Sequence, residues 1–337
     1  MGRLRTRRKL TTGLVAAIAI LGALAAAFSA QTVHHIVVVK VVSRPAASSL
    51  SLPASNRVAP DPRNLPTAPS AEPAAAASAL PRGAEQTFSQ LEAGSGGQLG
   101  VAVAPLGQGT ISVLGSLTEG HGWSAMKVPV LATLLRQRGS LDSQQQAWAQ
   151  QALTASDNQA ATALFGQLQR TDGGLVGASG AVQQTLNSAG DDRTRVNTAP
   201  NPNGFTTFGQ TEWSAEAATR FFRALARGCL LSSTQTRYVV GLMGQVIPSQ
   251  RWGMGQVALA GAPVALKGGW GPENGGPYLV RQSAIVGQGN QGYVVTILAR
   301  AHSGGDSFAA GTALLNDGAR WVAEHIKPNL SRPAAGC

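Results

Sequence analysis

The sequence predicts an α/β architecture of the α+β type: a five-stranded antiparallel sheet flanked by helices, with an inserted all-helical subdomain. Two observations lead to this prediction. Strand-like segments stand near both ends of residues 84–337, and a block of helical segments separates them. Because two strands precede the block and three follow it, the simplest packing brings the first and last strands together in one sheet.

Each element is predicted from its local pattern. Two strands, at 98–105 and 110–116, flank Leu106-Gly107-Gln108-Gly109, which is a hairpin signal. Apolar residues at spacings of three and four then predict helices at 125–137, 143–154, 158–168, 176–188, 215–226 and 233–244. Strands return at 263–268, 278–287 and 292–301. A closing helix at about 306–326 lies between Ser303-Gly304-Gly305 and Pro328.

Residues 1–30 predict export. A basic run at 3–9 precedes an apolar stretch over 14–28, as in a signal peptide, and small residues would allow cleavage after Ser29. An uncleaved signal anchor is the alternative, because no charge falls between Lys9 and Lys40 and about 20 apolar residues suffice to span a bilayer. In both cases the rest of the chain is exported, either secreted or anchored at the outer face of the cytoplasmic membrane. Membrane contact is expected only through this segment.

Residues 31–83 predict a juxtamembrane segment followed by a linker. Eight of the chain's 18 prolines fall within 43–83, with alanine and serine between them. This composition gives a stiff, extended spacer that holds a domain away from a membrane or a cell wall. We therefore expect the folded domain over 84–337.

The distribution of charge argues against a nucleic-acid partner. The formal net charge is +11, but residues 1–45 hold seven basic residues and no acid, while 84–337 hold 17 basic against 14 acidic residues. A nucleic-acid-binding protein should carry its basic patch on the folded part. The 43% of hydrophobic and 13% of charged residues are typical of a globular protein rather than a disordered one.

The cysteines and histidines predict no metal and no cofactor. The five histidines have no metal-ligand spacing, and Cys229 and Cys337 form no metal or redox motif. The pairing of the two cysteines and the oligomeric state are left open by the sequence.

The first candidate for chemistry is the pair Ser124 and Lys127. The two residues lie three positions apart at a predicted helix start, so they share a helical face. A serine hydroxyl becomes a good nucleophile when a neighbour takes its proton, and a buried lysine can do so because full burial moves its pKa by ~3–5 units. The backbone N–H of Ser124 would also help to hold an oxyanion. The alternative is a helix cap at Ser124 and a solvated Lys127.

The second candidate is Ser156-Asp157-Asn158, between two predicted helices. A hydroxyl and a carboxamide in one loop could relay a proton and hold a substrate amide. The alternative is an ordinary helix-capping sequence.

The third candidate is Lys267-Gly268-Gly269-Trp270, at the end of a predicted strand. Glycines there let a ligand backbone pair with the strand edge, and Lys267 offers a cation to a substrate carboxylate. The alternative is a turn after an exposed lysine.

Taken together and in this order, the three motifs resemble the S-x-x-K, S-D-N and K-[ST]-G set of the serine β-lactamase and penicillin-binding protein family. The resemblance runs from about Gln98 to Ile326 and is strongest to the class A β-lactamase-like branch. It implies the β-lactamase/transpeptidase-like fold. It also implies that Ser124 is the acylated nucleophile and Lys127 its activating base. Ser156 would then pass a proton to the leaving nitrogen, and Lys267 would set the electrostatics around Ser156.

The same resemblance implies the substrate-binding residues. Asn158 would bind the substrate's side-chain amide, and Gly268 and Gly269 would leave the strand edge open to it. The N–H groups of Trp270 and Ser124 would form the oxyanion hole. Arg281 is predicted as a second anchor for the carboxylate, with a solvated strand-edge arginine as the alternative.

The sequence departs from the family pattern at three places. Only 32 positions separate Ser124 from Ser156, so part of the helical insert is missing, and the third motif lacks a hydroxyl after the lysine. The stretch 191–214 takes the place of the family's omega loop, where a glutamate would position the deacylating water, but 193–210 contains no acid. Glu212 is interpreted as a carboxylate at a helix N-terminus. His121 is interpreted as local packing rather than a triad base.

These observations predict an exported serine acyl-transfer hydrolase that forms an acyl-serine with β-lactams or D-Ala-D-Ala-like peptides and deacylates slowly. A peptidoglycan D,D-carboxypeptidase or transpeptidase acting on the stem peptide is one alternative. A catalytically weak module that binds the cell wall is another, favoured by the Lys267-Gly268-Gly269 sequence and the acid-free loop.

Overall fold

The computed structural model describes residues 80–200, 204–257, 261–273, 276–287, 292–302, 308–326 and 337. All of them belong to the compact unit Ser70–Cys337. The predicted signal or anchor and nearly all of the predicted linker lie outside the described residues. Among the residues that are described, no helix is long and apolar enough to cross a membrane.

A five-stranded sheet forms the centre of the domain, in the order β2-β1-β5-β4-β3. Every pair of neighbouring strands is antiparallel. The first and last strands are paired, as the order of elements predicted, with Val101 opposite Ile297. The fold class predicted from the sequence is thus confirmed. The strands are β1 Gly97–Pro105, β2 Ser112–Gly115, β3 Val264–Pro272, β4 Tyr278–Val286 and β5 Tyr293–Ala301.

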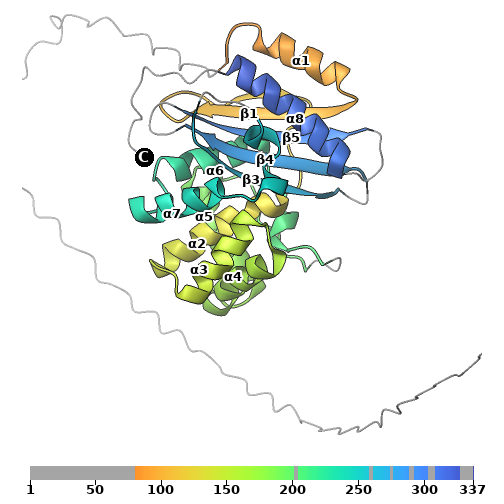
Figure 1. Ribbon diagram of the computed structural model, residues 1–337. Helices are drawn as coiled ribbons and strands as arrows, with labels where there is room; N and C mark the ends of the chain where they lie inside the picture. Colours follow the sequence, from red (N-terminus) through yellow and green to blue (C-terminus); the bar gives the residue numbers. More distant parts are fainter. Residues whose placement is uncertain are drawn as a thin grey trace, which may run out of the picture. The chain divides into compact units, whose positions relative to one another are not determined.

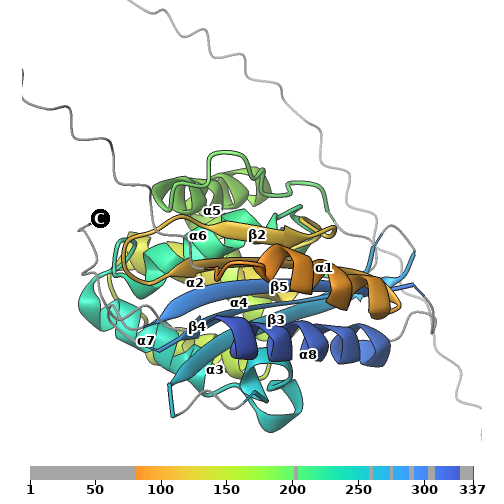
Figure 2. The ribbon, with the colours of Figure 1, turned by 90° about the horizontal axis from the view of Figure 1, so that it is seen from above.

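Helices cover both faces of the sheet (Figures 1 and 2). On one face lie α1 (Ala84–Gly94) and α8 (Phe308–His325), which meet where the rings of Phe88 and Trp321 pack edge to face at 4.9 Å. The short helix α1 was not predicted from the sequence. The helices on the other face are α2 Lys127–Arg138, α3 Ser143–Thr154, α4 Asn158–Thr171, α5 Leu175–Ser188, α6 Ala215–Ala226 and α7 Ser233–Gly244.

Local capping explains where several of these helices begin. Asp142 and Gln145 form a reciprocal capping box at α3, and Ser232 and Gln235 form another at α7. Ser214 caps α6 by accepting from the N–H of Ala217. These caps satisfy helix donors that would otherwise lack partners, and they account for the close match between predicted and observed boundaries.

Helix α2 is the central element of the helical subdomain. Every residue from Lys127 to Leu135 is buried, because other helices and residues of the sheet pack around this part of α2. A helix that is apolar all round is expected in such a place. The burial of α2 therefore brings the one lysine at its start into a water-poor environment.

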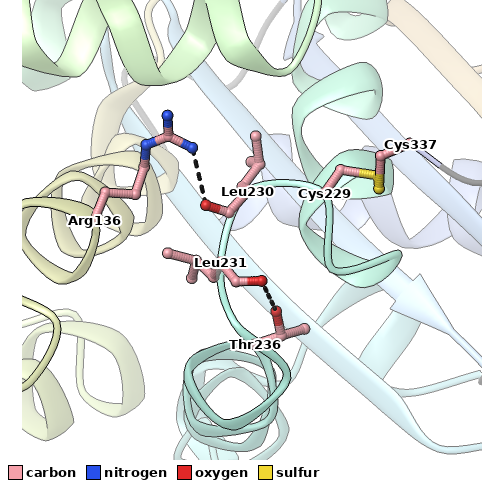
Figure 3. The surroundings of a disulfide bond; sticks show 6 residues. All are labelled: Arg136, Cys229, Leu230, Leu231, Thr236 and Cys337. Carbon is pink, nitrogen blue, oxygen red and sulfur yellow. Dashed lines mark hydrogen bonds between the residues drawn. A yellow bond between two sulfur atoms is a disulfide. The ribbon is translucent and has the colours of Figure 1, made fainter.

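A disulfide joins Cys229, just after α6, to Cys337, and the two Cα atoms are 5.3 Å apart (Figure 3). The bond spans 108 positions of the sequence. Beside it, Arg136 of α2 donates to the carbonyl oxygen of Leu230 at 2.9 Å. The pairing that the sequence left open is thus a covalent link between the two cysteines.

Candidate active site

Ser124 lies in a short 3-10 helix, Trp123–Met126, that leads directly into α2. The chain reaches it through a strained turn, because Trp123 has a φ of 46°, in the left-handed region. The Ser124 side chain is half-buried, and among the described residues its hydroxyl has no hydrogen-bond partner. Ser124 is therefore not a helix cap, and its hydroxyl is not committed to a structural contact.

Lys127 is buried beside it, with 1% of its surface exposed. Its Nζ donates to the carbonyl oxygen of Ser156 at 2.5 Å and to Oδ1 of Asn158 at 2.8 Å, and it lies 3.3 Å from Oγ of Ser156. The alternative of a solvated lysine is wrong. The amine contacts the 156–158 loop rather than the Ser124 hydroxyl, so the direct contact expected from the i, i+3 spacing is not formed in this state.

Ser156 is the second residue outside glycine with a left-handed backbone, at φ 58°. This conformation turns its hydroxyl toward both lysines: Nζ of Lys267 donates to Oγ of Ser156 at 2.7 Å and to the carbonyl oxygen of Gly268 at 2.9 Å. Asp157 caps α4 by accepting from Ala160 at 2.7 Å. The capping interpretation of this tripeptide is thus correct for Asp157 and does not exclude a site at Ser156.

Burial determines the electrostatics of the two amines. Desolvation lowers the pKa of Lys127 from 10.5 to about 7, although the nearby Asp157 carboxylate acts in the opposite direction. Desolvation also lowers the pKa of Lys267 well below its usual value, and the charge of Lys127 lowers it further. Lys267 is fully buried, so the alternative of an exposed lysine before a turn is wrong. Near neutral pH this pair offers an amine that can accept a proton.

Strand β3 forms one side of the site and is an edge of the sheet. A Cβ at Gly269 would lie 2.8 Å from the backbone nitrogen of Ser124, so only glycine lets the strand approach the nucleophile this closely. Gly268 is one position away, on the opposite face of the strand. A Cβ there would lie 2.5 Å from two ring carbons of Trp252. The indole of Trp252 therefore fills the space next to the position where the family has a hydroxyl.

The backbone of Trp270 lies beside the site, and its side chain lies on the opposite face of β3 from Gly269. It shares the face of Gly268, and its ring packs against Phe308 at 4.8 Å and Trp252 at 6.3 Å. The main chain of Trp270 directly follows Gly269, which touches the Ser124 backbone. This arrangement is compatible with the oxyanion role predicted for the N–H group, which stays a prediction.

Arg281 lies in the interior of the sheet. Its side chain is fully buried on β4, and its guanidinium donates to main-chain carbonyl oxygens, among them that of Trp213 at 2.9 Å. The alternative of a solvated strand-edge arginine is wrong, because the side chain is buried and β4 is not an edge strand. The role of a second carboxylate anchor stays a prediction. Burial lowers its pKa to about 10, against the opposing charges of Glu273 and Glu212.

The stretch that replaces the omega loop holds its carboxylates away from the lysines. Asp191 is buried and accepts from Nε1 of Trp213 at 3.1 Å and from the backbone N–H of Thr194 at 3.1 Å. Glu212 lies before the cap of α6 rather than in its first turn, so its interpretation as a helix N-terminal carboxylate is wrong. It forms an isolated antiparallel bridge with His121, and its Oε1 lies 3.3 Å from Nε2 of that histidine.

Sequence reasoning missed the surroundings of His121. Its backbone N–H donates to Oε1 of Glu273 at 2.7 Å, and Glu273 also pairs with Arg300. The interpretation of His121 as local packing rested on the lack of a nearby acid, and the fold supplies two. No spacing in the sequence signals these contacts, because 152 positions separate His121 from Glu273. Among the described residues no group of three potential ligands could hold a metal ion.

The family model for the β-lactamase enzyme family (Beta-lactamase2) matches residues 141–326, more than half of the chain. The match includes Ser156, Asn158 and Lys267 and begins after Ser124 and Lys127. No curated protein matches the chain in sequence.

Several solved structures that share this fold are β-lactamases, some of them described as class A. An ancestral class A β-lactamase is 21% identical with a TM-score of 0.56, over 72% of this chain and 99% of that one. A β-lactamase from Burkholderia vietnamiensis is 21% identical with a TM-score of 0.57, over 72% and 95% of the two chains. The chromosome-encoded β-lactamase of Vibrio parahaemolyticus is 18% identical with a TM-score of 0.57, over 72% and 98%. At these identities the likeness shows the fold.

The contact between Gly268 and Trp252 makes a prediction for stability. Gly268→Ser restores the family's hydroxyl but forces its Cβ against the Trp252 ring, so we expect a loss of about 1–3 kcal/mol in the free energy of unfolding, measured with urea. In a Trp252→Leu background the same substitution should cost less. Gly241→Ser is the control, since nothing lies within 4 Å of a Cβ there. Equal stability of Gly268→Ser and the wild type would contradict this account of the missing hydroxyl.

Proposed function

The chain belongs to the β-lactamase enzyme family, whose members are serine hydrolases, and we propose that it forms an acyl-enzyme at Ser124 with β-lactams or D-Ala-D-Ala-like peptides and releases the acyl group slowly. The observation that carries the proposal is the position of Ser156 between two buried amines. Its Oγ lies 2.7 Å from Nζ of Lys267 and 3.3 Å from Nζ of Lys127. Ser124, without a hydrogen-bond partner among the described residues, stands one helical turn before Lys127.

In the proposed acylation, Oγ of Ser124 attacks the carbonyl carbon and its proton passes to the neutral amine of Lys127. The C–N bond then breaks, and Ser156 gives its proton to the leaving nitrogen. The ammonium of Lys127 returns a proton to Ser156, so that the chain regains its starting protonation state. The contacts of Lys127 with Ser156 support the last transfer.

The oxyanion is held by the N–H groups of Ser124 and Trp270. The close approach of β3 to the Ser124 backbone at Gly269 supports this pairing. One such donor is worth about 3–4 kcal/mol of the activation barrier. Nζ of Lys267 donates to Oγ of Ser156 and so orients the hydroxyl that passes the proton. Asn158, exposed at the start of α4, binds the substrate's side-chain amide.

Slow deacylation follows from the missing base. The sequence 193–210 contains no carboxylate, and the next acid, Glu212, is paired with His121. Lys127 has a pKa suited to activating water, but in this state its amine donates to Ser156 and Asn158. The acyl-enzyme is therefore long-lived.

A long-lived acyl-enzyme also favours the alternative function, peptidoglycan D,D-carboxypeptidase or transpeptidase. An acyl group that water removes slowly remains available to an amine acceptor. Release of terminal D-Ala from a stem-peptide analogue, measured beside β-lactam hydrolysis, separates the two substrates.

Export, to a secreted or membrane-anchored location at the cell wall, is part of the proposal. The disulfide between Cys229 and Cys337 supports it, because disulfides persist in oxidising compartments outside the cytoplasm. The basic and apolar pattern of residues 1–30 supports it independently.

The acylation step predicts a covalent adduct. The full-length protein incubated with a penicillin should gain the mass of the drug, and digestion should locate the added mass on Ser124. Intact-mass measurement over time should show an adduct that lasts longer than the turnover time of an efficient β-lactamase. Ser124→Ala should lose the adduct, and Lys127→Ala should slow its formation by at least ~100-fold. Ser140→Ala, on an exposed loop, is the control. An adduct that forms equally on Ser124→Ala would refute the assignment.

The lowered pKa of Lys127 predicts a pH dependence of acylation. Only the neutral amine accepts a proton, so its fraction and the acylation rate should rise as the pH increases through about 7 and level off above it. Below this midpoint the rate should fall about tenfold per pH unit. Stopped-flow or quenched-flow acylation rates between pH 5 and 9 would show the profile. A midpoint near the ordinary lysine value would contradict it.

A further inference from the structure

The segment that leads into Ser124 is hydrogen-bonded to a fully buried arginine, Arg281. Nη1 of Arg281 donates to the carbonyl oxygens of Gly120 at 3.1 Å, His121 at 3.2 Å and Trp213 at 2.9 Å. Its guanidinium carbon also lies 5.3 Å from the centre of the Trp213 ring. Arg281 therefore binds two chain segments at once, the one before the nucleophile and the one before α6.

A carboxylate holds the same segment through its N–H group. Oε1 of Glu273, just after β3, accepts from the backbone N–H of His121 at 2.7 Å, and Oε2 pairs with Arg300 of β5. The Glu273 side chain is only 10% exposed. Charge-assisted hydrogen bonds in such an environment are stronger than neutral ones. We call Arg281, Glu273 and Arg300 the charge clamp.

The register of the sheet places the charge clamp directly beneath the nucleophile. Arg281 is opposite Gly269 in the β3–β4 pair, and a Cβ at Gly269 would lie 2.8 Å from the backbone nitrogen of Ser124. Between the clamp and Ser124 lies Trp123, with its left-handed backbone at φ 46°. A strained residue of this kind persists only where its surroundings fix it. The clamp holds Gly120 and His121, three and two positions before it.

We propose that Arg281 and Glu273 are positioning residues for acyl transfer, which hold Gly120 and His121 so that the N–H and hydroxyl of Ser124 face β3 at Gly269. The inference rests on the proposed acylation of Ser124. It assigns to Arg281 a role other than binding a substrate carboxylate, since the side chain is fully buried and its Nη1 donates to three main-chain carbonyl oxygens. Its Nε and Nη2, which have no hydrogen-bond partner among the described residues, are buried as well.

Two probes separate positioning from carboxylate binding. A penicillin and its methyl ester differ only in the carboxylate, and the acylation rate constant and the dissociation constant of the initial complex are measured for each. For Arg281→Lys the clamp predicts a rate constant lower by ~10–100-fold for both probes, with unchanged initial affinity. A loss confined to the penicillin would overturn the proposal and identify Arg281 as a carboxylate anchor.

The second variant pair tests Glu273, should Arg281→Lys not fold. Glu273→Ala removes the acceptor of the His121 N–H and should lower the acylation rate constant by a similar factor. Glu273→Gln keeps an acceptor oxygen and should retain most of the rate. The control is Glu216→Ala, which breaks the exposed pair between Glu216 and Arg220 on α6 and should leave the rate unchanged. Equal losses in Glu273→Gln and Glu273→Ala would overturn the acceptor role.

Hydrogen exchange tests the charge clamp without any acylation. In Glu273→Ala the backbone amides of residues 118–126 should exchange faster than in the wild type, while Glu216→Ala leaves them unchanged. Unchanged exchange in Glu273→Ala would overturn the charge clamp. If the wild type forms no adduct with either probe, the proposed function fails, and the exchange result alone decides whether the clamp orders the segment.

Discussion

The candidate site depends on one shared hydroxyl. Oγ of Ser156 lies within hydrogen-bond reach of the amines of Lys127 and Lys267, and both amines are nearly or fully excluded from water. Two ammonium ions so close together in a medium of low dielectric repel each other, and burial disfavours the charge of each. Both effects favour loss of a proton, and a lysine that is neutral near pH 7 is a base. The buried helix α2 and the edge strand β3 are the elements that create this environment.

Strand β3 organises the site because its two faces contact different parts of the protein. Lys267 and Gly269 face the helical subdomain, where one contacts Ser156 and the other allows Ser124 to approach. Gly268 and Trp270 face α8, where Trp252 packs against both. Trp123 and Ser156, the two residues other than glycine with a left-handed backbone in the described part of the chain, lie in the segments that this strand contacts. Such strain is common at functional sites, and here the packing against β3 maintains it.

The sequence predicted the elements well because each carries its own local signal. Periodicity and caps placed α3, α6 and α7 at their observed bounds, and strand order predicted the pairing of β1 with β5. It could not predict the contacts of Glu273 and Arg281 with Gly120 and His121, because these join residues more than 150 positions apart. Glu212 was misinterpreted for a related reason. Its position near a helix start suggested a dipole interaction, whereas the fold pairs it with His121.

The central claim is that Lys127 has a strongly lowered pKa inside the folded protein. Selective ¹³C labelling of the lysine ε-carbons and NMR titration measure it directly, because the chain has only five lysines and Lys127→Arg assigns the signal. The account predicts a titration midpoint for Lys127 near 7. A midpoint at the ordinary value of 10.5, in a protein that remains folded, would contradict the account.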